Sequence, residues 1–197
     1  AEAIRLGLEV LGLLGVKLTS SPSASSVKAE LGAADKSLSG KNPDRLVDLH
    51  LMEEESNKAA MRVLMQIATP AFAGNAPLFY SIIARMIQLS TKHGNAPASA
   101  YAYAAYGMIL CGDGESERGY RIGRMALDLV EKLQARDLKC RVYFLYSAGV
   151  HHWKQHARES TDYLTHAYQA GLESGDLEYV AAVIFLLTAS ALWVGHK

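Results

Sequence analysis

Histidines are the residues of this chain whose spacing best suits chemistry. His152 and His156 lie four residues apart, so one helix would place both imidazoles on one face, a spacing that can hold zinc. His151 and His166 lie nearby in the sequence. Zinc needs a third protein ligand, however, and Glu159 falls across an expected turn. We therefore expect ordinary histidines near a helix end and no bound metal, although the sequence alone leaves metal binding by residues 151–156 open.

Two short motifs partly match sequence motifs of enzyme active sites, but each lacks a residue that the motif requires. Gly112-Asp113-Gly114 has no lysine, and its carboxylate would repel phosphate, so a turn is expected rather than a phosphate-binding loop. Gly114-Glu115-Ser116-Glu117 starts like a nucleophile elbow, but Arg118 stands in place of the second glycine and no strand precedes it. Ser116 is instead expected to cap the following helix. The sequence predicts no catalytic residue and no cofactor.

Aromatic residues supply the remaining candidate for a binding site. The chain has ten tyrosines against four phenylalanines, and amphipathic aromatic side chains suit recognition surfaces. If Gly107 and Gly149 are equivalent contact positions in neighbouring helices, a concave groove would be lined by Tyr101, Met108, Tyr143, Tyr146 and Trp153. The alternative is that these side chains pack between neighbouring helices.

Composition narrows the classes of function. The 197 residues suffice for one domain or for a run of helical pairs, and twenty Lys and Arg balance twenty Asp and Glu. No basic run forms the patch that nucleic-acid binding requires, no apolar stretch is long enough to span a membrane, and no signal peptide is visible. Cys111 and Cys140 match no metal or disulfide spacing and are expected as buried thiols. We therefore expect a cytoplasmic protein that binds neither nucleic acid nor membrane.

The apolar periodicity predicts helices throughout and no strand. Residues 1–52 are expected to pack, as irregularly spaced elements, on an array formed by residues 53–197. These elements are a helix over Ala1 to Leu18, a Ser-rich linker around Pro22, a helix over Val27 to Leu38, and a short helix over Pro43 to Asp48 capped by Asn42.

Two copies of one tetrapeptide mark expected helix boundaries in the next part of the chain. Gly74-Asn75-Ala76-Pro77 and Gly94-Asn95-Ala96-Pro97 each combine a glycine that ends a helix, an asparagine that caps the next, and a first-turn proline. Thr69-Pro70 is expected to end the helix before the first copy. The later helices are expected over Pro77 to Lys92, Ala98 to Cys111, Glu117 to Gln134, Leu138 to Trp153, Ser160 to Glu173 and Leu177 to Val194, with turns near Gly112, Asp137, His156 and Gly175.

Helix junctions also recur at a fixed interval. His93-Gly94-Asn95, Ala135-Arg136-Asp137 and Ser174-Gly175-Asp176 are spaced by roughly forty residues, which is typical of stacked helical hairpins. The helices alternate between apolar and amphipathic, as the inner and outer layers of a solenoid do. Gly107 and Ala126 lie nineteen residues apart (126 − 107), the spacing of small residues in a tetratricopeptide-type hairpin, and Ala148 with Ala167 repeats it. The predicted fold is all-α: a tetratricopeptide-like array of about four hairpins.

Five segments together resemble a known family. They are Lys58-Ala59-Ala60-Met61-Arg62, Pro70-Ala71-Phe72, Gly94-Asn95-Ala96-Pro97, Tyr103-Ala104-Ala105-Tyr106-Gly107-Met108 and Cys111-Gly112. They resemble the helical region after the ATPase module in large multidomain signalling proteins, which join a serine/threonine kinase, a P-loop ATPase, a GAF domain and often a histidine kinase. The likeness covers roughly the whole chain and is strongest from Ala59 to Gly112. It implies a tetratricopeptide-like scaffold without assigned chemistry, since kinase and ATPase motifs are absent here.

These observations predict a non-catalytic scaffold in signal transduction, with other proteins or flanking domains of the same chain as partners. A small-molecule sensor that regulates an attached ATPase or kinase is the alternative, and it calls for a closed, aromatic-lined cavity. The apolar ending suggests a fragment of something longer. Residues 177–194 are apolar on most of their surface, so we expect an exposed patch there, Trp193 included, and association into a homo-oligomer.

Overall fold

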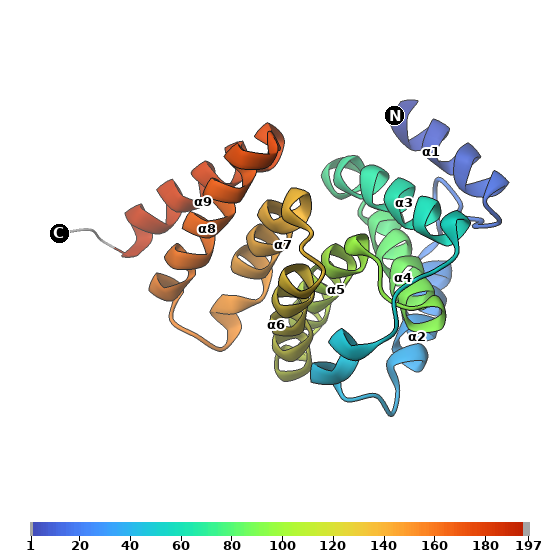
Figure 1. Ribbon diagram of the computed structural model, residues 1–197, viewed down its shortest axis with the longest axis horizontal. Helices are drawn as coiled ribbons and strands as arrows, with labels where there is room; N and C mark the ends of the chain where they lie inside the picture. The colour runs from blue at the N-terminus through green and yellow to red at the C-terminus, as the bar shows by residue number, and fades with distance from the viewer. Residues whose placement is uncertain (1, 195–197) are drawn as a thin grey trace. The chain divides into compact units, whose positions relative to one another are not determined.

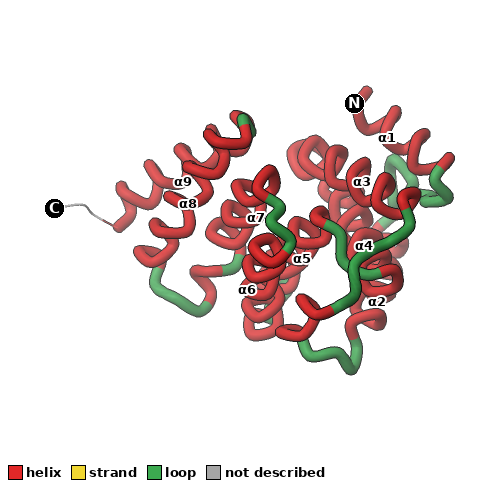
Figure 2. Tube along the Cα trace, viewed as in Figure 1, coloured by secondary structure: helices red, strands yellow, loops and turns green. Residues whose placement is uncertain are grey.

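The computed structural model describes the backbone of residues 2–194 and, except at residues 157 and 192–194, their side chains (Figure 1). This described part is helical and contains no strand, as predicted (Figure 2). The chain divides into two compact units, residues 1–102 and 103–197, so each unit is considered by itself. The division falls inside α5 (Pro97–Gly112), whose residues 98–111 are all buried except the half-buried Met108.

The first unit contains α1 (Glu2–Leu13), α2 (Ala24–Leu38), the 3₁₀ helix η1 (Pro43–Asp48), α3 (Glu55–Gly74), α4 (Ala76–His93) and the start of α5. Helix α4 packs against both α2 and α3, and α1 packs against α3. The N-terminal segment therefore covers the α3–α4 pair. Its core is aliphatic and includes Leu11, Ala34, Leu64, Ile83 and Ile87, each with little or no exposed surface.

Two helix ends in this unit differ from the sequence prediction. Helix α1 ends at Leu13 rather than Leu18, because the chain turns at Gly15, whose φ of 79° is left-handed. Helix α3 continues through Pro70 to Gly74. A proline removes only the single backbone bond that its own nitrogen would donate, and here the following turn persists, with the Asn75 N–H donating to the Ala71 carbonyl at 2.7 Å.

The two copies of the tetrapeptide adopt different structures. Asn75 is a helix cap, as predicted: its Oδ1 accepts from the Leu78 N–H at 3.2 Å. Asn95 is 1% exposed, and its Nδ2 donates to the Leu46 carbonyl at 2.8 Å. Its backbone forms an isolated parallel bridge with Leu51, in which the Asn95 N–H donates to the His50 carbonyl and the Met52 N–H donates to the Asn95 carbonyl. Asn95 thus joins residues 46–52 to the start of α5.

The second unit contains the rest of α5, α6 (Ser116–Lys132), α7 (Arg136–Gly149), the 3₁₀ turns η2 (His151–Trp153) and η3 (Ala157–Glu159), α8 (Ser160–Ser174) and α9 (Leu177–Val194). Helix α7 packs against α6, α8 and α9, and α8 packs against α9. Successive helices run in alternating directions (Figure 1), and the predicted turns near Gly112, Asp137, His156 and Gly175 are confirmed.

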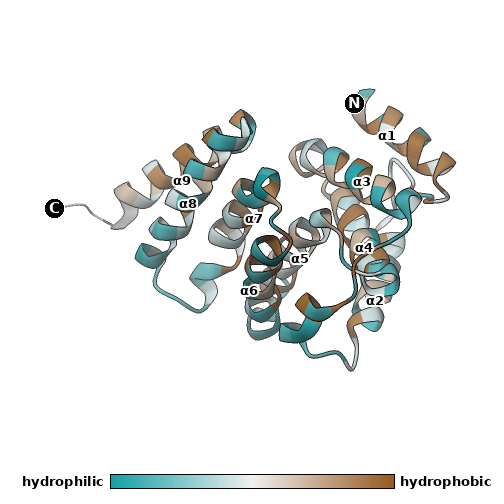
Figure 3. Ribbon diagram, in the orientation of Figure 1, coloured by the Kyte–Doolittle hydropathy of each residue, from teal (hydrophilic) through white to brown (hydrophobic). Residues whose placement is uncertain are grey.

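Helix α6 shows how small residues bring these helices together. A Cβ built on Gly107 would lie 2.8 Å from the Gly119 carbonyl oxygen and 3.1 Å from the Gly123 nitrogen, so only glycine permits this approach of α5 and α6. A Cβ on Gly123 would meet Val150 and Tyr146 at the end of α7. The polar residues of α6 remain on its outer side, which gives it the mixed colouring of Figure 3.

Two expectations for this unit are wrong. Ser116 is the first residue of α6, and Glu115 occupies the cap position without a capping side-chain hydrogen bond, so Ser116 is not the predicted cap. The helix expected from Leu138 to Trp153 ends at Gly149, and His151–Trp153 form a separate 3₁₀ turn. His152 and His156 therefore do not share a helical face.

Candidate interaction site

The residues predicted to line a groove have different surroundings. Tyr101, in the first unit, and Tyr146, in the second, are buried at 1% and 0% exposure, so neither ring is available to a partner in this structure. Met108 and Tyr143 are half-buried, and Met108 lies against Gly149. Trp153 is 47% exposed, with its ring centroid 5.6 Å from that of His152. The groove itself stays a prediction.

Part of the predicted set belongs to a tyrosine cluster in the second unit. The Tyr163 ring on α8 lies 5.1 Å from Tyr146 and 6.2 Å from Tyr143, between ring centroids. The Tyr120 ring on α6 lies 6.2 Å from Tyr146 and shares a hydrogen bond with it. The sequence analysis missed Tyr120 and Tyr163, because their meeting depends on how three helices pack.

Charged groups surround this cluster. The exposed Arg124 donates from Nη1 to the Tyr163 hydroxyl at 2.7 Å. Tyr143 donates from its hydroxyl to Glu131 Oε1 at 2.8 Å. Burial, and then their hydrogen bonds, raise the pKa of Tyr143 and Tyr146. Both phenols therefore stay neutral at ordinary pH and serve packing and hydrogen bonding rather than proton transfer.

The histidines do not gather into a metal site. His151 is 2% exposed inside the tyrosine cluster, whereas His152 and His156 are exposed on the segment between α7 and α8. His166 lies on α8 with its ring 6.2 Å from that of Tyr143. Among the described residues, no group of three His, Cys, Asp or Glu side chains is placed to hold a metal ion.

Helix α9 presents the most apolar exposed face of the second unit. Leu177, Ile184 and Phe185 are 68%, 47% and 76% exposed. At 100° per residue, these positions and the exposed Ala181 and Thr188 share one side of the helix, and none of the five is charged. We call this set the α9 face. The opposite side is buried through Tyr179, Val180 and Val183. The Trp193 side chain, expected to join this patch, lies outside the described residues.

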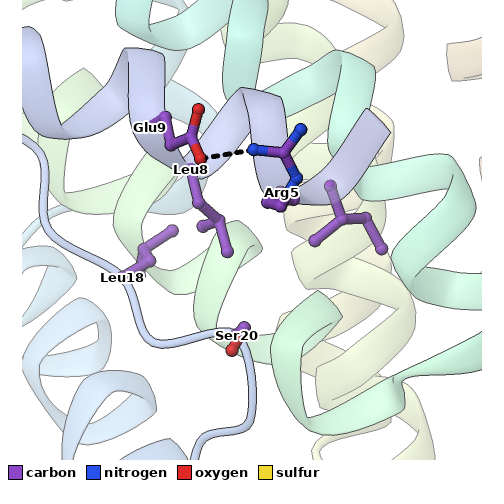
Figure 4. A pocket seen from close by; sticks show the side chains of 6 residues that line it. Arg5, Leu8, Glu9, Leu18 and Ser20 are labelled. Atoms are coloured by element: carbon purple, nitrogen blue, oxygen red, sulfur yellow. Dashed lines mark hydrogen bonds and ion pairs between the residues drawn. The ribbon is translucent and has the colours of Figure 1, made fainter. Parts of the chain in front are cut away.

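The first unit contains an open hollow of about 470 Å³ between α1 and the linker that follows it (Figure 4). Its lining residues are Ile4, Arg5, Leu8, Glu9, Leu18 and Ser20. Arg5 and Glu9 pair across one turn of α1 at 2.7 Å. The hollow is open and has no aromatic lining residue, so it differs from the closed aromatic cavity that a small-molecule sensor calls for. In the described part of the chain, no helix combines the length and the apolarity of a membrane span.

The chain has a weak likeness to a known signalling protein. No family model matches the chain, and no solved structure matches it. The chain is similar to a signalling histidine kinase. It is 25% identical over 122 residues to the hybrid signal transduction histidine kinase G of Dictyostelium discoideum. The matched segment covers 59% of this chain and 4% of the length of that relative.

Proposed function

We propose that this chain is a non-catalytic, tetratricopeptide-like scaffold that holds protein segments together within a longer signalling protein bearing kinase and ATPase modules. The observation that carries the proposal is the α9 face, a row of exposed apolar side chains without a charge. Soluble proteins rarely leave such a row exposed unless it meets another protein. The same proposal includes a cytoplasmic location.

The packing of the second unit supports a repeat array. The contact of Gly107 with Gly119 joins α5 and α6 as one hairpin, and α7 packs against α8 as the next. A Cβ on Gly171 would meet Val180 and Cys140, so close approach at a small residue recurs where α8 meets its neighbours. Repeat arrays bind partners on extended surfaces made by several helices.

The similarity to a hybrid histidine kinase supports the signalling setting. The matched segment makes up 4% of the relative's length, so the rest of that relative is long enough to hold the kinase that its name states. A helical segment of this kind suits a connecting role because it carries interaction surface without needing a reaction centre of its own.

Burial of the α9 face would contribute favourable free energy to docking. Covering a leucine, isoleucine or phenylalanine side chain fully is worth about 1.5–3 kcal/mol each. Leu177, Ile184 and Phe185 lie within a helix of 18 residues and form one continuous anchor. The exposed Glu178 lies at the edge of this row and leaves its centre apolar.

Site-specific photo-crosslinking in the full-length protein tests the proposal. A photoreactive phenylalanine at position 185 should crosslink to one reproducible segment of the parent chain or of a partner protein, identified by mass spectrometry. The matched control is Phe72 on α3, which is 60% exposed in the first unit. Docking on the α9 face would be refuted if position 185 gave no reproducible crosslink. In that case its products would be spread over many segments or lost to reaction with water, as at position 72.

Self-association gives a second measurement on the same face. We expect the isolated chain to form a homo-oligomer through residues 177–194 and Phe185→Glu to abolish it, because a carboxylate at the centre of an apolar contact would be buried unpaired. Leu172→Glu on α8, at a residue 51% exposed, is the control and should leave the association intact. A strict monomer by light scattering at high concentration contradicts the expectation.

A further inference from the structure

His151 occupies an unusual position for a titratable residue. It is 2% exposed, in the 3₁₀ turn that follows α7. Its ring centroid lies 5.6 Å from that of Tyr146 on α7 and 5.3 Å from that of Tyr163 on α8. Nδ1 lies 3.4 Å from the Tyr146 hydroxyl, and Nε2 is buried without a hydrogen-bond partner in the described structure. One side chain thus joins α7 to α8 while leaving one of its nitrogens unsatisfied.

The groups facing this ring come from every element packed on it. They are Arg124 of α6, Tyr146 of α7, His152 of η2, the backbone of His156, Glu159 of η3, and Tyr163 of α8. Burial is the largest influence and lowers the pKa of His151. The charges of His152 and Arg124 act in the same direction, while the His156 backbone and the Glu159 carboxylate oppose it. The ring is therefore neutral at neutral pH.

We propose that neutral His151 is a proton-sensitive latch: it holds residues 150–160 against the tyrosine cluster, and its protonation releases that segment from α7 and α8. A proton on both ring nitrogens creates a buried cation, and the positive charge of Arg124 disfavours it further. Nε2 makes no hydrogen bond of ordinary geometry in the described structure, and the His156 backbone offsets only part of the cost of burying the charge. Moving the ring into water relieves both costs.

Release is expected to be local. His152, Trp153, Lys154, Gln155 and His156 are already exposed, so the segment contributes little apolar burial apart from His151 and Val150. Lys154 pairs with Glu117 of α6 at 2.7 Å, but both side chains are partly or largely exposed, and such a pair is weak. Helices α7 and α8 also pack against each other and against α9, so they should stay folded when residues 150–160 are released.

The direction of the pH effect follows from the lowered pKa. The ordinary histidine value is 6.5, and the folded value lies below it. The stabilisation from the packed neutral ring is complete above the ordinary value, and it is lost as the pH falls toward and through the folded pKa. Opening is thus expected on mild acidification and not on raising the pH.

Hydrogen exchange of residues 150–160, corrected for the intrinsic pH dependence of exchange, tests the latch between about pH 8 and about pH 4.5. We expect protection there to fall at least about tenfold on acidification while the circular dichroism of the helices is retained. His151→Phe keeps an aromatic ring between Tyr146 and Tyr163 but cannot titrate, so it should abolish the fall. His152→Gln and His156→Gln, at exposed histidines of the same segment, are matched controls and should preserve it.

Three results would overturn the latch. One is a fall in protection that persists in His151→Phe, and another is a fall that disappears in His152→Gln. The third is acid opening only together with loss of the helical signal, which would be global unfolding. If His151→Phe does not fold, NMR titration of histidine-labelled wild-type protein decides the question. A His151 ring that titrates at or above 6.5 would refute the latch, and one that titrates below it in step with shifts of residues 150–160 would support it.

Discussion

Arg141 of α7 and Asp176, the residue before α9, form a two-point ion pair. Arg141 donates from Nε to Asp176 Oδ2 at 2.6 Å and from Nη2 to Oδ1 at 3.3 Å. The two side chains are only 14% and 9% exposed, and the guanidinium lies 4.8 Å from the centre of the Tyr179 ring. The pair fixes the start of α9 on α7, and with it the orientation of the α9 face.

Asp176→Asn should be strongly destabilising. The substitution keeps the shape of the side chain but leaves the Arg141 guanidinium largely buried without its counter-charge, at a cost of about 3 kcal/mol. Urea unfolding and hydrogen exchange of α9 measure the effect. The control is Glu9→Gln, which breaks the exposed Arg5–Glu9 pair and should cost about 0.5 kcal/mol or less. Equal effects of the two substitutions would show that the Arg141–Asp176 pair contributes no more than a surface contact.

Gly107→Ala should destabilise the second unit by about 1–3 kcal/mol, and Gly107→Leu by more, because even one methyl group meets the backbone of α6. Gly112 is the matched control: it lies in the same helix, and an added Cβ there has nothing within 4 Å. Gly112→Ala should be neutral or slightly stabilising in thermal unfolding. Ser116→Ala, at a residue that does not cap α6, should change stability by less than about 0.5 kcal/mol. A Ser116→Ala variant less stable than Gly107→Ala would contradict this packing.

Asn95→Ala should cost more than Asn75→Ala although both residues sit in the same tetrapeptide. Loss of the Asn75 side chain removes its cap and an exposed hydrogen bond to the Ser20 carbonyl, and is expected to cost about 1 kcal/mol. Loss of the buried Asn95 amide removes its hydrogen bond to the Leu46 carbonyl, which keeps only the longer bond from the Leu49 N–H at 3.3 Å, and leaves a small buried space, at about 2–3 kcal/mol in all. Hydrogen exchange should locate the Asn95 effect in residues 46–52. Equal costs, or an effect confined to α5, would contradict the bridging role of Asn95.

Cys111 and Cys140 should resist alkylation at pH 8 in the native protein, a pH chosen at about the value where an ordinary thiol begins to ionise. Both are buried and unpaired, and burial raises the pKa of each thiol to about 11. Mass spectrometry should find both labelled only after denaturation, with no disulfide between them. Rapid labelling of either thiol in the native state would show that its helix opens readily.

Much of the secondary structure follows from local sequence. The apolar periods of α4, α6 and α8 and the capping residue Asn42 act within a few residues, so the helices and turns they specify match the prediction. The ends of α1 and α7 differ from the prediction. Helix α1 ends early because the chain turns at the left-handed Gly15, and α7 ends early because His151 begins a separate turn that packs against Tyr146 and Tyr163. The helical character of the described chain was predictable, whereas the tyrosine cluster was not.

The sequence by itself determined where the helices lie, because propensity, capping and apolar spacing are properties of neighbouring residues. The tertiary structure decided what identical residues do. Asn75 and Asn95 share their local sequence, and each donates from Nδ2 to a distant carbonyl, that of Ser20 or of Leu46. Asn75 is half-buried and also caps a helix, whereas Asn95 is buried because its backbone pairs with residues 50–52. His151 likewise became a buried residue between two tyrosines while His152 stayed exposed. Burial and long-range partners depend on how distant helices pack, and no local pattern encodes that packing directly.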